Sequence, residues 1–140
     1  MAVSADLVES LSRLSLFADL TRPQLQAIAH EYGDEMFGDG QRVLRRGLSG
    51  SALYVVLEGE AVVRRGDAEL NRLGPGEVAG EISALLGEPP SADVVAFGLL
   101  RCLVVPAPQV EPFLLEHPTV LLRMLKSEAR RLRGMVEGLP

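Results

Sequence analysis

The chain has too few residues of several kinds to suit some common classes of protein. Its single cysteine, Cys102, excludes an internal disulfide framework, so we expect a small core residue in a reducing cytoplasm. No apolar run approaches the roughly 20 residues of a membrane span, and no signal-peptide pattern is present. Its two histidines, His30 and His117, lack partners at metal-ligand spacing and suggest surface or capping positions. We therefore predict a cytoplasmic protein with neither a membrane segment nor a metal site.

The sequence also lacks the usual signatures of catalysis. It has no nucleophile elbow, P-loop or paired-acid motif, so we expect no enzymatic activity and no obligatory cofactor. The net charge of −5 gives no general electrostatic case for binding nucleic acid or an anionic membrane. Five basic residues cluster near the C-terminus: Arg123, Lys126, Arg130, Arg131 and Arg133. We interpret them as a solvated helix face, with a surface for nucleic acid or an acidic partner as the alternative.

What is present suits one globular domain over residues 1–140, because 47% of the residues are hydrophobic and 24% are charged. Helical periodicity predicts helices within 1–34, including one over 5–14 and one that begins with a Thr21–Gln24 capping box. A short helix over 109–116, with Pro112 in its first turn, and a longer one from Pro118 are predicted within 107–140.

Between these helices, over 35–106, the period changes to that of short strands separated by glycine-bearing turns. The predicted strands are 35–37, 42–45, 53–57, 60–65, 68–73, 91–96 and 99–105. The turns include 38–40, 47–50, Gly59 and 66–67. Short strands at this spacing are typical of a sandwich or a barrel.

One stretch within this region, 73–95, combines a Gly-Pro-Gly turn with a very short helix. Gly80-Glu81 opens the apolar run 82–86, and Gly87 with Pro89-Pro90 ends it. A strand, a glycine, a one-turn helix and a return strand bring several free backbone N–H groups to one helix terminus. Such a terminus favours an anion such as phosphate or carboxylate.

The segment from Gly80 to Ala96, GEISALLGEPPSADVVA, resembles the phosphate-binding cassette of cyclic nucleotide-binding domains, roughly G-E-L-A-L-L-x-x-x-P-R-S-A-T-V-x-A. The phrase from Leu44 to Gly59 and the order of the helices are also similar to that family, and the resemblance covers about 17–133. It implies a mainly β fold with α: a jelly-roll barrel, with the cassette at 74–95, flanked by N-terminal and C-terminal helices.

The resemblance implies roles for three positions of the cassette. Glu81 retains the glutamate that binds the ribose 2′-hydroxyl, whereas the arginine that grips the cyclic phosphate is replaced by Pro90 and the threonine contact by Asp93. Loss of one partner from a buried ion pair costs roughly 3–5 kcal/mol. The candidate ligand pocket comprises Gly80, Glu81, Ile82, Ser83, Pro89, Pro90, Ser91, Ala92 and Asp93.

The resemblance therefore implies a regulatory or sensor domain with weak or no cAMP and cGMP binding, in which the C-terminal helices signal to an effector domain or partner protein. One alternative is a genuine cAMP or cGMP sensor. Another, of a different class, is a ligand-free dimerisation or protein-interaction module. Related bacterial transcription regulators carry a helix-turn-helix after this helix, so the chain is either a sensor domain of a longer protein or a free-standing module.

A regular apolar seam on the last predicted helix suggests a partner. Its members are spaced three and four residues apart: Leu122, Leu125, Ala129, Leu132 and Val136. Such spacing is typical of a helix that packs on another helix. We expect part of the seam to cover the barrel and the rest to form a parallel homodimer. The alternative is that the barrel and the N-terminal helices bury the whole seam within a monomer.

Overall fold

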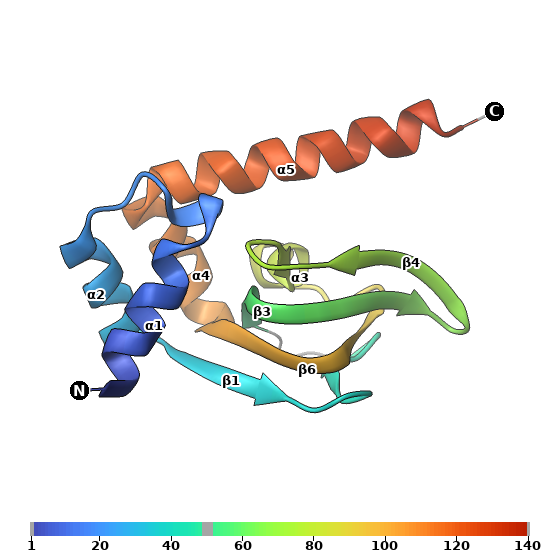
Figure 1. The fold of residues 1–140 in the computed structure, drawn as a ribbon. Helices are drawn as coiled ribbons and strands as arrows, with labels where there is room; N and C mark the ends of the chain where they lie inside the picture. Colours follow the sequence, from blue (N-terminus) through green and yellow to red (C-terminus); the bar gives the residue numbers. More distant parts are fainter. Residues whose placement is uncertain (1, 49–51, 140) are drawn as a thin grey trace.

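The computed structural model describes residues 2–48 and 52–139, with side chains from residue 5 onward, and places helices at both ends of a central sheet (Figure 1). Two helices and one 3₁₀ turn come first: α1 (Ala2–Ser12), η1 (Ser15–Phe17) and α2 (Arg22–Glu31). The central strands are β1 (Gly33–Phe37), β2 (Arg42–Leu44), β3 (Ala52–Arg65), β4 (Ala68–Leu73), β5 (Val78–Ala79) and β6 (Asp93–Pro106). The short helix α3 (Glu81–Leu86) precedes β6, and α4 (Ala107–Glu116) and α5 (Pro118–Glu137) follow it.

The sheet is built on two long antiparallel strands, β3 and β6, which pair from Ala52↔Pro106 to Arg64↔Asp93. β1 and β2 pair with β6, while β4 and β5 pair with β3. One apolar core lies between the helices and the sheet, and a second lies within the strands around Phe37, Val56 and Leu100. The predicted fold class, a mainly antiparallel β structure flanked by helices, is confirmed.

The prediction of separate strands on either side of Gly59, and again around Gly98, is wrong. Each pair is one continuous 14-residue strand with an irregular register at the glycine-bearing region. Gly59 has φ +89°, and a Cβ there would lie 2.2 Å from the carbonyl oxygen of Leu99. This glycine therefore allows close approach of two paired strands, as in a bulge, rather than reversal of the chain.

The N-terminal helices are attached to the sheet by apolar packing and by one charged cluster. The Thr21–Gln24 capping box is present at the start of α2, as predicted. The guanidinium of Arg101, on β6, donates to Asp34 at 2.6 Å and to the hydroxyl of Ser10 on α1 at 2.9 Å. Because Arg101 is buried, this bonding stabilises one arrangement of α1 against the sheet.

The first C-terminal helix begins earlier than predicted, whereas the second begins at Pro118 as predicted. α4 begins at Ala107, which places Pro112 inside the helix rather than in its first turn. α5 contacts η1 and α4 and then extends past α3 and β4 (Figure 1), with only Val120 and Met124 buried.

None of the described helices has both the length and the apolar character required to cross a membrane.

The predicted apolar seam of α5 faces away from the core. Its large members, Leu122, Leu125, Leu132 and Val136, are between 50% and 62% exposed, and Ala129 is also exposed. The alternative that a monomer buries the whole seam is wrong. Two members, Leu122 and Leu125, line hollows between α5 and the rest of the domain without being buried. A different stripe of the helix, through Val120 and Met124, packs on the core because the docking angle of α5 turns the seam outward.

Candidate functional site

The cassette begins with a backbone arrangement that requires glycine. β5 pairs with β3, and Gly80 follows it with φ +85° as the residue before α3. A Cβ at Gly80 would lie 2.0 Å from the carbonyl oxygen of Ala52, so no other residue fits without displacing the backbone. α3 then ends at Gly87, which has φ +68°. The sequence pattern thus predicted both ends of this helix correctly.

A small cavity of about 160 Å³ lies between α3 and the barrel. Seven of the nine candidate residues line it: Gly80, Glu81, Ile82, Ser83, Pro90, Ser91 and Ala92. The remaining wall comes from apolar barrel residues such as Leu44, Val63 and Leu73, and from Arg131 of α5. Ligand sites for small molecules are usually about 300–1,000 Å³, so this cassette pocket is narrow as it stands.

The other two candidates, Pro89 and Asp93, do not line the cavity. The Oδ1 atom of Asp93 accepts a hydrogen bond from the backbone N–H of Arg46 at 2.8 Å. Next to it, the N–H of Gly47 donates to the carbonyl of Pro90 at 2.9 Å. Asp93 therefore holds the segment after β2 against the cassette, a structural role that its place in the motif did not indicate.

One cation reaches the cassette pocket, and it comes from a helix far away in the sequence. Arg131 lines the pocket from α5, with guanidinium nitrogens 3.5 Å from a carboxylate oxygen of Glu77 and 3.6 Å from one of Glu128. Arg45, Arg46 and Arg101 are not among the lining residues. Sequence reasoning missed Arg131 as a pocket residue, because a basic residue on a charged helix carries no signal of which element it faces.

Glu81 lies in an unusual electrostatic environment at the edge of the pocket. It is only 8% exposed, and its Oε2 atom has no hydrogen-bond partner among the described residues. The Oε1 atom of Glu128, on α5, is likewise buried without a hydrogen-bond partner among the described residues, and its nearest cation is Arg131 at 3.6 Å. Burial, followed by the charge of Glu128, raises the pKa of Glu81 to about 7, although the charge of Arg131 opposes this.

Two facing carboxylates without a proton can only repel, whereas one shared proton lets Glu81 donate a hydrogen bond to Glu128. The carboxyl group of Glu81 thus lies beside a carboxylate of the C-terminal helix, and this proximity favours its protonated form.

The remaining single residues have simpler roles. Burial raises the pKa of the Cys102 thiol to about 12, consistent with the predicted small core residue. His30 is exposed, as expected. His117 is buried at 7% exposure and occupies the capping position between α4 and α5, one of the two expected settings, with its ring 5.1 Å from that of Phe113.

The solved structures that resemble this chain include regulatory domains of protein kinases and a bacterial regulator. The regulatory domain of Toxoplasma gondii protein kinase A in complex with cAMP has a TM-score of 0.74 and 22% identity, covering 91% of this chain. This chain spans about half, 51%, of that structure. The N-terminal domain of a transcriptional regulator from Streptomyces coelicolor has a TM-score of 0.64 and 28% identity, covering 93% of this chain and 94% of its own.

A third similar structure is the regulatory subunit of a cAMP-independent protein kinase A from Trypanosoma brucei. It is a triple mutant, in which one substitution introduces an arginine, bound to cAMP in its A site. It has a TM-score of 0.74 and 23% identity, with coverage of 92% of this chain and 52% of that one. The model of the cyclic nucleotide-binding domain matches residues 35–117, well over half of the sequence. The chain therefore belongs to the cyclic nucleotide-binding domain family.

Proposed function

We propose that this protein is a non-catalytic regulatory domain whose cassette pocket binds cAMP and cGMP weakly or not at all, and whose α5 helix reports the state of that pocket to an effector. The single observation that carries the proposal is the identity of the groups around the pocket. Pro90 lines it where the family pattern has arginine, and Glu81 faces a second carboxylate, Glu128.

The electrostatics of the pocket are unfavourable for a cyclic phosphate. The one cation among its lining residues, Arg131, already lies near the carboxylates of Glu77 and Glu128. A buried anion without its own charge partner loses roughly 3–5 kcal/mol of binding free energy, which corresponds to about two to four decades in the dissociation constant. Backbone N–H groups at the start of α3 can recover only a part of this loss.

The position of α5 supplies the means of regulation. Because Arg131 and Glu128 both reach the cassette from this helix, any ligand that displaces either of them changes the contacts that hold α5 in place. A ligand shifts such an equilibrium by its difference in affinity for the two arrangements. The description of the T. brucei relative as cAMP-independent supports a regulatory role for this fold without cAMP control.

The expected result of calorimetric titration is a dissociation constant for cAMP and for cGMP weaker than about 100 μM. The reason is the absence of a dedicated phosphate cation at Pro90. Adenosine, which lacks the phosphate, serves as the control, and its dissociation constant should differ from that of cAMP by no more than a few-fold. A low-micromolar constant for either cyclic nucleotide would contradict the proposal.

A low-micromolar result would instead favour the alternative of a genuine cyclic nucleotide sensor. In that case Arg131 must supply the missing cation, since it is the one basic side chain that lines the pocket in the described parts of the chain, 2–48 and 52–139. Arg131→Gln should then abolish binding, whereas Arg133→Gln, at an exposed position of the same helix, should leave it unchanged.

The exposed apolar seam of α5 favours a second candidate function, a dimerisation module. Four large apolar residues at heptad-like spacing are at least half exposed over four turns of the helix. Burial of such side chains contributes about 1.5–3 kcal/mol each, which is enough to drive pairing of two copies. We propose a parallel homodimer through α5 on this basis.

Wild-type protein is therefore expected to sediment as a dimer, and Leu132→Glu as a folded monomer, because a charge would replace an apolar contact within the seam. Leu132 is 62% exposed, so the substitution should not unfold the domain. Leu99→Glu, at a leucine of β6 that is 66% exposed, is the matched control and should remain dimeric. A monomeric wild type at high concentration would eliminate this candidate.

The setting of the domain is also a proposal. A single buried thiol suits a reducing cytoplasm, where disulfides are rare. We further propose that residues 1–140 fold as one unit, since the N-terminal helices, the sheet and α4 share one apolar core. A partner protein or effector domain that contacts α5 would receive the signal.

A further inference from the structure

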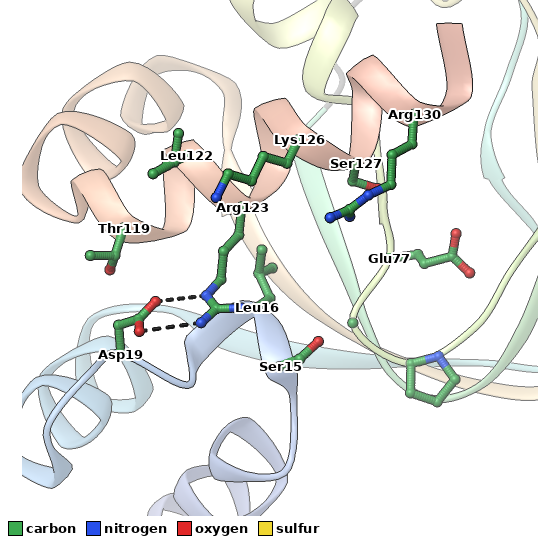
Figure 2. A pocket seen from close by; sticks show the side chains of 12 residues that line it. Ser15, Leu16, Asp19, Glu77, Thr119, Leu122, Arg123, Lys126, Ser127 and Arg130 are labelled. Atoms are coloured by element: carbon green, nitrogen blue, oxygen red, sulfur yellow. Dashed lines mark hydrogen bonds and ion pairs between the residues drawn. The ribbon is translucent and has the colours of Figure 1, made fainter. Parts of the chain in front are cut away.

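A second and larger cavity lies on the other side of α5 from the cassette pocket. It has a volume of about 560 Å³ and is bounded by α5, by the η1 region and by the turn between β4 and β5 (Figure 2). We call it the α5 groove, and its central residues are Ser15, Asp19, Glu77, Arg123, Lys126 and Arg130. The sequence predicts Arg123, Lys126 and Arg130 to lie on a solvated helix face, with a binding surface as the alternative, but it does not predict a cavity there.

The groove carries three cations from one face of α5. Arg123, Lys126 and Arg130 are three and four residues apart, so they project on the same side of the helix (Figure 2). Arg123 is fixed by Asp19, with contacts of 2.6 and 3.2 Å. Lys126 and Arg130 form no ion pair with any residue of the described part of the chain and are exposed.

The groove also contains hydroxyl-bearing residues and a second carboxylate besides Asp19. Ser15, Thr119 and Ser127 are among its lining residues. The carboxylate of Glu77 lies on the opposite wall, but its Oε1 atom accepts from the N–H of Gly74 at 3.0 Å and its Oε2 atom lies 3.5 Å from Arg131. The groove thus keeps two free cations in a chain whose net charge is −5.

We propose that the α5 groove binds a small soluble anion that carries one or more phosphate groups. A guanidinium matches the oxygens of phosphate bidentately, an ammonium adds a point charge, and hydroxyl groups donate to the remaining oxygens. The volume lies within the range of small-molecule sites, and the site is concave, which suits a compact ligand better than an extended polyanion.

Such binding would act on the same helix that reaches the cassette. Arg130 lines the groove while its neighbour Arg131 lines the cassette pocket, so α5 separates two sites through consecutive residues. An anion between α5 and the β4–β5 turn would stabilise the docked position of the helix, because it would bind that arrangement preferentially. This inference does not rest on the proposed function of the cassette pocket.

Inorganic triphosphate is the probe, titrated into the full chain by calorimetry at low ionic strength. The expected result is one site, with affinity that falls as salt rises, because the contacts are exposed and electrostatic. Lys126→Gln/Arg130→Gln should weaken binding at least about ten-fold. The matched control, Arg65→Gln/Arg133→Gln, removes the same charge at exposed positions outside the groove and should change affinity less than about two-fold.

Three results would overturn the proposal. The first is absence of binding to the wild-type protein. The second is equal weakening in the two double variants, which would indicate a response to net charge alone. The third is that Arg131→Gln loses binding while Lys126→Gln/Arg130→Gln binds as tightly as the wild type, which would place the anion in the cassette pocket. Thermal unfolding of each variant in the absence of probe verifies that it is folded.

Discussion

Replacing Glu81 by glutamine is expected to stabilise the protein at pH 8 by up to about 3 kcal/mol and to remove most of the pH dependence of its stability between pH 5 and 8. In the wild type at pH 8, the ionised Glu81 is buried beside Glu128, and its Oε2 atom has no hydrogen-bond partner among the described residues. The glutamine amide is neutral at every pH, and its NH₂ group is a hydrogen-bond donor beside the carboxylate of Glu128.

The direction follows from the raised pKa of Glu81. It is about 7 in the folded protein against an ordinary value of 4.5, so the folded state keeps a proton that the unfolded chain has lost. The stabilising contribution is therefore complete below about pH 4.5, declines as pH rises, and is lost once the pH exceeds about 7. Each pKa unit of difference between the folded and unfolded states corresponds to about 1.4 kcal/mol of stability, which gives the upper limit stated above.

Urea unfolding at pH 5 and at pH 8 measures this effect directly. Glu128→Gln should likewise reduce the pH dependence, because it removes the charge that faces Glu81. Glu88→Gln is the matched control: it lies just after α3 with an exposed side chain, and should behave as the wild type does. An equal fall in stability from pH 5 to pH 8 for wild type and Glu81→Gln would show that the pair does not couple α5 to the cassette.

Pro90→Arg is expected to improve the affinity for cAMP at least ten-fold, which is about 1.4 kcal/mol. Pro90 is buried and lines the cassette pocket, so an arginine there can direct its guanidinium to the phosphate and bind it bidentately. The gain should diminish at high salt, since part of it is electrostatic. Calorimetric titration of the wild type and the variant with cAMP gives the ratio of their dissociation constants.

Pro89→Arg is the control for this substitution, because Pro89 is exposed and does not line the pocket. It adds the same charge at the adjacent residue and should yield less than half of the gain in binding free energy. If folded Pro90→Arg binds no better than wild type, the pocket itself is closed, and the ligand-free dimerisation module becomes the better account.

The position of Asp93 changes what a second substitution can contribute. From the motif alone, Asp93→Thr would be expected to help by removing a negative charge beside the phosphate. In the structure that carboxylate accepts a hydrogen bond from the N–H of Arg46 and does not line the pocket. We therefore expect Asp93→Thr to add little affinity and to destabilise the domain by about 1 kcal/mol, the usual value of such a bond.

The sequence by itself determined the elements whose causes are local. The Thr21–Gln24 capping box and the glycines at the two ends of α3 each act within a few residues, so their spacing predicted the start of α2 and the whole of the cassette helix. Glycine and proline spacing also predicted that 74–95 forms a unit around a short helix. These features require no knowledge of distant contacts, because hydrogen bonds and backbone conformation between near neighbours decide them.

Only the tertiary structure decided what lies around that unit. Glu128 and Arg131 reach the cassette because α5 docks beside α3, and an amphipathic pattern does not encode the angle at which a helix docks. The same docking leaves the apolar seam exposed and creates the α5 groove from three separate segments of the chain. The sequence around Gly59 does not separate a turn from a bulge, because a glycine at positive φ suits both, and only the pairing of β3 with β6 distinguishes the two.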